Sequence, residues 1–198
     1  MEFAKQGAKV GIDDVNEEAQ ETVKKIEDMS GETLFTKTDV SSVEEVKHLI
    51  DTTVKTLGHL DYTFNNAGIL NDANRFGAVS VEEFDQVMNI DLKGVFLAMK
   101  YQLNQMEENG GGTIVNTSSE AGLIADPEMP LYVAAKHGVV GLTQSAGFDY
   151  VKENIRVNTV APGLVETATR KYRLLKSTFC FSIIGYSLIL AFFTINSF

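Results

Sequence analysis

The chain lacks what several classes of protein require. Its single cysteine, Cys180, rules out an internal disulfide. Basic residues are few, with 17 lysine and arginine residues against 27 acidic residues. The formal net charge of −10 argues against nucleic acid as a partner, because proteins that bind phosphate backbones need clustered positive charge. The three histidines are scattered, and no group of Cys, His, Asp or Glu residues has metal-ligand spacing, so we expect no metal.

The two ends of the chain carry further absences. The first residues show no signal-peptide pattern, which predicts a cytoplasmic protein. No charged residue occurs from Ser177 to Phe198, an apolar stretch that approaches the roughly 20 residues needed to span a bilayer. With the basic residues of 170–176 as its flank, this tail is either a membrane anchor or sequence that is not natural to the protein, such as readthrough. We place a boundary near Thr169, between a domain over 1–169 and a tail over 170–198.

The remaining sequence has an α/β pattern. With hydrophobic residues at 44% and charged residues at 22%, the composition is that of a soluble globular domain. Short β-rich runs alternate with stretches of helical periodicity, and this alternation predicts a doubly wound parallel sheet with helices on both faces. The predicted strands are Lys9–Ile12, Thr33–Lys37, Asp61–Asn65, Thr113–Thr117 and Arg156–Val160.

Two helix starts carry the pattern of a capping box. In Ser41–Glu44 and Ser80–Glu83 a serine is followed three residues later by a glutamate, so helices are predicted from about Ser42 and Ser80. Further on, the apolar positions between Val87 and Leu103 have helical spacing and predict packing on the sheet or on a partner subunit.

Asp14 follows the first predicted strand. A dinucleotide-binding fold places an acid there to accept hydrogen bonds from the adenosine ribose and to repel a 2′-phosphate, which favours NAD over NADP. The alternative is that Asp13, Asp14 or Asn16 caps a helix beginning at Glu17.

Three other motifs have both a functional and a structural interpretation. Asn65–Gly68 ends a strand with small residues that let a ligand approach the backbone, or it is an ordinary turn. Tyr132 and Lys136 share a helix face, so the ammonium either lowers the pKa of the phenol for acid/base work or forms a surface pair. Ser119 follows the strand Thr113–Thr117, where a polar turn is also expected.

The ordered combination of these motifs resembles the short-chain dehydrogenase/reductase family along nearly all of residues 1–169. The resemblance also includes Asp39–Val40 and the segment Pro162–Thr167 after the last strand. It implies a Rossmann-like fold and hydride transfer between a nicotinamide cofactor and an alcohol or ketone. It further implies that Tyr132 is the acid/base, that Lys136 lowers the pKa of the tyrosine and binds the nicotinamide ribose, and that Ser119 hydrogen-bonds the substrate oxygen.

The resemblance also implies the residues that contact the cofactor and a homo-oligomer as the assembled state. Besides Asp14, Tyr132 and Lys136, the implied cofactor contacts are Asp39, Val40, Asn66, Ala67, Gly68, Pro162, Gly163, Val165 and Thr167.

The sequence departs from the family pattern in three places. The first strand and its glycine-rich phosphate loop do not precede Met1, and the usual C-terminal elements do not follow Thr169, so the domain is expected to be truncated at both ends. The missing strand belongs at the centre of the sheet, and its two neighbours are expected to lack a ladder partner. Asp91 stands where the family usually has an asparagine of a proton relay. Two functions follow: an NAD-dependent oxidoreductase, or a catalytically impaired family member that binds cofactor poorly and acts only as a subunit or non-functional fragment.

Overall fold

The protein was analysed as a computed structural model in which residues 1–163 are described. Their five strands form two parallel sheets, ordered β1-β2 and β3-β4-β5. The α/β class is confirmed, and the predicted Thr33–Lys37 strand has the predicted bounds. The strands are β1 (Val10–Asp14), β2 (Thr33–Lys37), β3 (Tyr62–Asn65), β4 (Gly112–Thr117) and β5 (Ile155–Val160).

Helices connect every pair of consecutive strands. The α-helices are α1 (Glu2–Lys5), α2 (Gln20–Glu27), α3 (Val43–Leu57), α4 (Val81–Val87), α5 (Gly94–Asn109) and α6 (Pro130–Asp149). Shorter 3-10 turns are η1 (Glu17–Ala19), η2 (Phe76–Ala78), η4 (Glu120–Gly122) and η5 (Val151–Glu153), and η3 (Met88–Lys93) is a π-helix. None of the helices in residues 1–163 combines the length and apolarity needed to cross a membrane.

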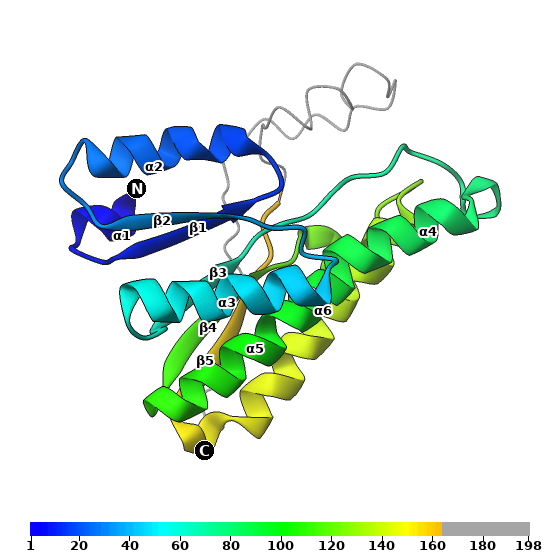
Figure 1. Cartoon of the computed structure of the whole chain (residues 1–198). Helices are drawn as coiled ribbons and strands as arrows, with labels where there is room; N and C mark the ends of the chain where they lie inside the picture. Colours follow the sequence, from blue (N-terminus) through cyan, green and yellow to red (C-terminus); the bar gives the residue numbers. More distant parts are fainter. Residues whose placement is uncertain (164–198) are drawn as a thin grey trace.

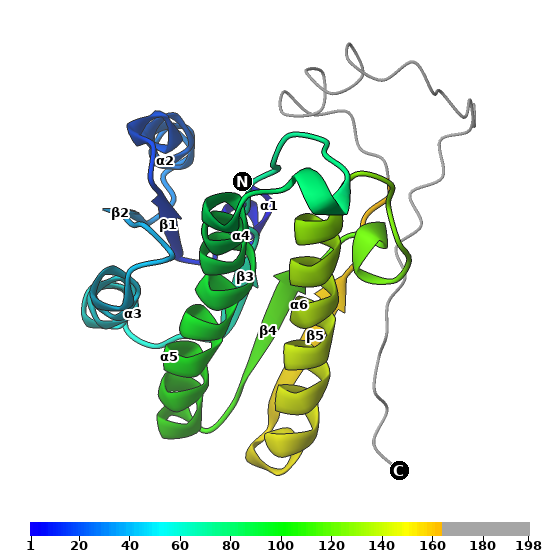
Figure 2. The same ribbon diagram turned by 90° about the vertical axis from the view of Figure 1, so that its right-hand side faces the viewer.

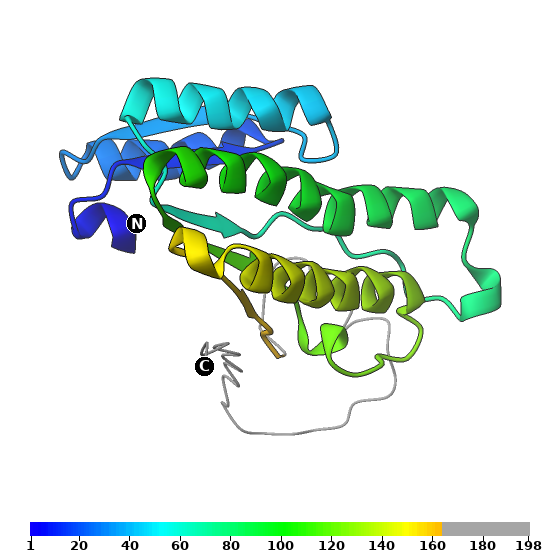
Figure 3. The same ribbon diagram turned by 90° about the horizontal axis from the view of Figure 1, so that it is seen from below.

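The helices form layers on the sheets. Helices α2 and α3 lie on opposite faces of β1 and β2 (Figure 1). From below, α3, α5 and α6 lie side by side in one layer (Figure 3), and the view in Figure 2 places α5 and α6 over one face of β3, β4 and β5. This doubly wound arrangement is the predicted architecture.

Serine caps start α3 and α4, with one difference from the prediction. Ser80 forms the predicted capping box, since its side chain accepts from the Glu83 backbone N–H while the Glu83 carboxylate accepts from the Ser80 backbone N–H. The predicted box at Ser41–Glu44 is wrong. Ser42 is the N-cap and accepts from the Glu45 backbone N–H, whereas Glu45 accepts from the backbone of Asp39 instead of returning to the cap.

The two sheets are not joined by a ladder. Among the described residues, β1 pairs only with β2 and β3 pairs with β4, so β1 and β3 each keep one edge without a strand partner. The sequence predicts that the two neighbours of the family's central strand lack a ladder partner, and β1 and β3 are such strands.

The core lies between β3–β5 and the layer of α5 and α6. Ile114 and Val139 are completely buried there, next to Val95, Met99 and Leu103. The predicted packing of the 87–103 segment against the sheet is therefore confirmed. The face opposite this core carries Tyr62 and Phe64, which are 67% and 57% exposed.

Candidate active site

The predicted site residues gather at one edge of the sheets. Because the strands of each sheet are parallel, the residues after Asn65, Thr117 and Val160 lie at one carboxyl edge, and those after Asp14 and Lys37 lie at the carboxyl edge of the other sheet. Helix α6 places its first turns at this edge, since its residues contact the η4 turn that follows β4. The topology thus brings Asn66–Gly68, Ser119 and Tyr132 to one region of the molecule.

Tyr132 and Lys136 share one face of α6, as predicted. The Lys136 Nζ atom lies 5.4 Å from the centre of the Tyr132 ring, and the lysine is only 3% exposed. A buried ammonium this close to a phenol favours the phenolate form. The alternative of a solvent-facing helical pair is therefore wrong for Lys136, whereas Tyr132 is half-buried.

Two groups hold the buried lysine. Its Nζ donates a hydrogen bond to the backbone carbonyl of Thr117 at 3.2 Å and lies 3.6 Å from Asp91 Oδ2. Asp91 is completely buried, and its other oxygen accepts from the Ile69 backbone N–H at 2.8 Å. The acid at the family's asparagine position is thus an ion-pair partner of Lys136.

Burial acts on both charges of this pair. Desolvation raises the pKa of Asp91 above its usual range, and the positive charge of Lys136 opposes that change. Desolvation likewise lowers the pKa of Lys136, against the opposing effect of the Asp91 carboxylate. Each charge therefore stabilises the other, and the Thr117 carbonyl gives the ammonium a second partner.

Ser119 lies directly after β4 and begins the η4 turn. Its Oγ accepts a hydrogen bond from the Ala121 backbone N–H at 3.2 Å, which leaves the hydroxyl proton as a donor. The neighbouring Ser118 hydroxyl donates to the Lys136 carbonyl at 2.9 Å. A Cβ atom on Gly122 would lie 2.7 Å from that same carbonyl, so only glycine lets this turn pack so closely on α6.

The Asn66–Gly68 loop covers the ion pair. Asn66 Oδ1 accepts from the Thr117 hydroxyl at 3.0 Å, which ties the loop to β4. Asn66, Ala67 and Gly68 are exposed, and a Cβ atom on Gly68 would lie 3.2 Å from Asp91 Oδ2 and 3.4 Å from Lys136 Nζ. The absence of that Cβ lets the loop backbone pack closely on the buried ion pair.

Asp14 and Asp39 lie at the ends of the outer strands. Asp14 ends β1 and is exposed, and its Oδ1 accepts from the Asn16 backbone N–H at 2.8 Å. No side chain among Asp13, Asp14 and Asn16 caps a helix at Glu17, where the structure has the 3-10 turn η1 before α2 begins at Gln20. Asn16 thus occupies the N-cap position of a helical segment that begins at Glu17, as the alternative predicted, but the predicted side-chain cap is not formed.

Sequence reasoning missed a cation beside Asp14. Lys37 is its ladder partner on β2, and the Lys37 ammonium lies 3.5 Å from the Glu17 carboxylate. Asp14, Glu17 and Lys37 together leave one net negative charge at this end of β1. A strand register could not be read from the sequence, so this pairing carried no detectable signal.

Asp39 forms hydrogen bonds with Ser41, and Val40 packs on Gly94. The Asp39 carboxylate accepts from the Ser41 backbone N–H and hydroxyl, and these hydrogen bonds lower the pKa of Asp39. Val40 packs against the start of α5, where a Cβ atom on Gly94 would lie 2.9 Å from Val40 Cγ2.

The loop after β5 meets the loop after β4. The Pro162 carbonyl accepts from the Glu120 backbone N–H at 3.0 Å, and a Cβ atom on Gly163 would lie 3.3 Å from Glu120 Oε2. Pro162 and Gly163 therefore lie next to the Ser119 turn. Val165, Thr167 and the tail over 170–198 lie outside the described residues.

A buried polar network that the sequence did not reveal supports this edge. Asn65 and Gln102 exchange hydrogen bonds at 3.0 and 2.7 Å, and Asn65 also donates to Asn116 Oδ1 at 2.8 Å. Asn116 is completely buried and donates to Thr143 Oγ1 at 2.9 Å. The network joins β3, β4, α5 and α6 immediately below Asn66 and Thr117. Its one signal in the sequence is an asparagine inside the apolar run Thr113–Thr117.

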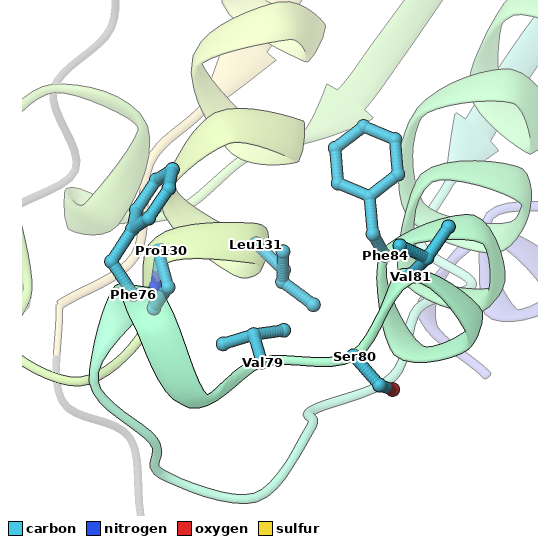
Figure 4. A pocket seen from close by; sticks show the side chains of 7 residues that line it. All are labelled: Phe76, Val79, Ser80, Val81, Phe84, Pro130 and Leu131. Carbon is cyan, nitrogen blue, oxygen red and sulfur yellow. The ribbon is translucent and has the colours of Figure 1, made fainter.

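A small apolar hollow of about 200 Å³ lies beside the first turn of α6. Phe76 and Phe84 stand on opposite sides of it, with Leu131 between them (Figure 4). Pro130 and Leu131 of its lining directly precede Tyr132, so the hollow borders the start of the helix that carries the predicted acid/base.

Comparison with known proteins identifies the family. The model described as short chain dehydrogenase matches residues 1–177, and the chain belongs to this family of oxidoreductases. It is 45% identical over 166 residues to an uncharacterised oxidoreductase of Thermotoga maritima, covering 83% of this chain and 65% of that protein. It is 41% identical to cyclohexanol dehydrogenase of Acinetobacter sp., with 83% and 66% covered. It is also 44% identical to 2,5-dichloro-2,5-cyclohexadiene-1,4-diol dehydrogenase of Sphingobium indicum, with 81% and 64% covered.

Solved structures agree with this assignment. The crystal structure of levodione reductase has a TM-score of 0.84 and 37% identity, covering 87% of this chain and 68% of that one. ElxO with NADP bound has a TM-score of 0.80 at 33% identity, with 87% and 70% covered. NAD+-bound xylitol dehydrogenase has a TM-score of 0.83 at 31% identity, with 87% and 67% covered. The chain spans less than two thirds of the length of the curated relatives named above.

Proposed function

We propose that the protein is an NAD-dependent dehydrogenase that interconverts a secondary alcohol and a ketone. The observation that carries the proposal is the half-buried Tyr132, whose ring centre lies 5.4 Å from the Nζ atom of the buried Lys136 at the carboxyl edge of a parallel sheet. Ligands of open α/β sheets bind at this edge. Membership of an oxidoreductase family supports the same reaction class.

The proposed mechanism gives each side chain one task. During alcohol oxidation the Tyr132 phenolate accepts the hydroxyl proton, and the Lys136 ammonium stabilises that phenolate. Ser119 donates its hydroxyl proton to the substrate oxygen, because its lone pair already accepts from Ala121. The nicotinamide supplies the hydride acceptor when bound. During ketone reduction the Tyr132 hydroxyl donates the same proton to the substrate oxygen.

The residues at this edge fit a nicotinamide dinucleotide. The exposed backbone of Ala67 and Gly68 lacks bulky side chains and lies directly above Lys136, where a ribose could approach. The exposed carboxylate of Asp14 can accept hydrogen bonds from the hydroxyls of the other ribose. We propose further contacts from Asp39, Val40, Asn66, Pro162 and Gly163, and from Val165 and Thr167.

For the substrate we propose an alcohol on a six-membered carbon ring. Two of the relatives are named for cyclohexanol and for a cyclohexadiene diol. The apolar hollow, whose lining residues Pro130 and Leu131 directly precede Tyr132 in α6, offers a surface for such a ring. A panel of cyclohexanol, linear secondary alcohols and sugar alcohols tests this choice, which is wrong if the ring alcohol is the poorest substrate.

A second candidate is a subunit with impaired catalysis. The separate β1-β2 and β3-β4-β5 sheets favour it, because no ladder fixes Asp14 relative to Asn66 across the described residues. Calorimetric titration of the full chain with NAD separates the candidates. Binding in the micromolar range supports the enzyme, and undetectable binding supports the impaired subunit.

We further propose a homo-oligomer formed through the outer faces of α5 and α6. Phe96 and Phe148 on these helices are 47% and 67% exposed, and large exposed aromatic side chains are typical of protein interfaces. Sedimentation velocity tests the assembly. A monomer at micromolar concentration would contradict it.

Tyr132→Phe tests the acid/base directly. The change removes the hydroxyl and keeps the ring, so turnover should fall at least about 100-fold while folding is retained. Tyr150→Phe, at the end of the same helix, is the matched control and should stay near wild type. Absorbance of reduced nicotinamide gives the rates and circular dichroism gives the folded fraction. Activity of Tyr132→Phe within a few-fold of wild type would remove Tyr132 from the mechanism.

Asp14→Ala tests the proposed preference for NAD. The Asp14 carboxylate would lie beside the extra phosphate of NADP, and Lys37 is already paired with Glu17. The ratio of kcat/KM for NADP to that for NAD should rise about tenfold, which corresponds to roughly 1.4 kcal/mol of lost repulsion. Glu18→Ala, an exposed acid four residues away, should leave the ratio unchanged. Equal use of both cofactors by the wild type contradicts the preference itself.

A further inference from the structure

The ion pair between Asp91 and Lys136 places a negative charge inside the proposed site. Asp91 Oδ2 lies 3.6 Å from Lys136 Nζ, and the two residues are 0% and 3% exposed. At such burial each charge stabilises the other, and the Thr117 carbonyl also accepts a hydrogen bond from the ammonium at 3.2 Å. The usual amide at position 91 would leave the lysine as a single positive charge beside Tyr132.

The backbone geometry aims Asp91 at this position. It lies within the π-helix η3, between α4 and α5, where the wider turn changes the direction of the side chains. Its Oδ1 accepts from the Ile69 backbone N–H at 2.8 Å, and this bond fixes the carboxylate. Oδ2 makes no hydrogen bond in the described part of the chain and faces only the ammonium at ion-pair distance.

We propose that Asp91 is a positioning residue that sets the charge beside Tyr132, by holding Lys136 as its counter-ion and tying it to the Gly68–Ile69 turn. The inference rests on the proposed function of Tyr132. Its consequence is a phenol that lies beside a neutral pair rather than beside an unopposed cation. The proton affinity of Tyr132 is then higher than the lysine alone would make it.

Further charged or titratable groups lie on the segments that neighbour Tyr132. The charged or titratable groups on the neighbouring segments are Glu120 after β4, Asp126 and Glu128 before α6, Lys93 after Asp91, and His137 of α6. Lys93 donates to the Ser41 carbonyl, and the His137 ring contacts the Val133 carbonyl. A change in the titration of Tyr132 on substitution at Asp91 therefore reports on the pair.

Asp91→Asn is the decisive variant, because it removes the charge with almost no change in shape. The pKa of Tyr132 should fall by about one unit or more, the order expected for loss of a unit charge several ångström away at an effective dielectric constant near 20. The measurement is a pH titration of the full chain labelled with 13Cζ-tyrosine, with the Tyr132 resonance assigned through Tyr132→Phe. This readout does not require activity.

The kinetic prediction has the same sign. The acidic limb of kcat/KM for alcohol oxidation should move to lower pH by the same amount, since the base is then deprotonated at lower pH. Asp51→Asn is the control, because Asp51 pairs with Lys47 at 2.8 Å on the exposed side of α3 and should shift neither titration. An unchanged or raised Tyr132 pKa in Asp91→Asn overturns the proposal, whereas a lowered pKa in a protein without dehydrogenase activity refutes only the proposed function.

A stability comparison covers the case in which Asp91→Asn fails to fold. Lys136→Met leaves the Asp91 carboxylate buried without its counter-ion and should lower the urea midpoint. Adding Asp91→Asn to Lys136→Met should restore a large part of that loss, because the orphaned charge is removed. A double variant no more stable than Lys136→Met would overturn the pairing.

Discussion

Asn116 offers the strongest test of how the core supports the site. It is completely buried in β4, accepts from Asn65 at 2.8 Å and donates to Thr143 at 2.9 Å. Asn116→Ala removes these two hydrogen bonds at about 1 kcal/mol each, together with a weaker contact to Met99 Sδ at 3.2 Å, and it leaves one Asn65 amide proton unsatisfied at about 1 to 3 kcal/mol. The cost at Thr143 is smaller, because its hydroxyl loses one donor but still donates its own proton to the Val139 carbonyl. The expected loss of unfolding free energy is about 3 to 5 kcal/mol.

Urea unfolding followed by circular dichroism measures this loss. The matched control is Asn158→Ala on the neighbouring strand β5, where the side chain lies on the opposite face of the sheet from Asn116 and is half-buried. The control should lose less than about 1 kcal/mol. If Asn116→Ala loses no more than Asn158→Ala, the network does not stabilise the core and the reasoning fails. Because Thr117 follows Asn116 and holds Lys136, weaker cofactor binding should accompany the loss.

Two smaller predictions concern local hydrogen bonds at helix starts. Ser80→Ala breaks the capping box of α4 and should lower the unfolding free energy by about 1 kcal/mol in urea titrations, whereas Ser145→Ala on the exposed side of α6 should have no such cost. Ser41→Ala removes a hydrogen bond that lowers the pKa of Asp39 below its usual 3.8. A lowered carboxyl pKa stabilises the folded state above the unfolded value, and the gain is lost as pH falls through the folded pKa. The stability difference between wild type and Ser41→Ala should therefore be present above about pH 4, stay below about 1 kcal/mol at this exposed site, and vanish at lower pH.

The strands could be predicted because each apolar run is short and ends in polar or small residues. Thr33–Lys37 has the predicted bounds, and β4 begins only one residue before the predicted Thr113. The prediction for β1 stopped at Ile12, whereas the strand continues to Asp14. Backbone pairing with β2 keeps Asp13 and Asp14 extended, and hydrophobicity does not record that pairing.

Helix starts were less certain, since a side chain can satisfy more than one backbone group. Ser41 and Ser42 both precede possible glutamate partners, and the sequence predicted the pairing of Ser41 with Glu44. In the structure Asp39 holds Ser41 in a turn and Glu45 binds the Asp39 backbone, so Ser42 becomes the cap. Competition among local hydrogen bonds decided the outcome.

The roles of Asp91 and Lys136 show why a site is harder to predict than its motifs. The spacing of Tyr132 and Lys136 predicts a shared helix face, but a helical pair on a surface has the same spacing. The lysine is buried because α6 packs on the β4 end and η4, which brings the Thr117 carbonyl and Asp91 to Nζ from segments 19 and 45 positions away. A π-helix then aims Asp91 inward, and a 3.6-residue periodicity does not predict such a turn. The charge next to the proposed acid/base is therefore a property of tertiary packing, and a substitution at Asp91 should change the chemistry of Tyr132 without changing any residue of the motif itself.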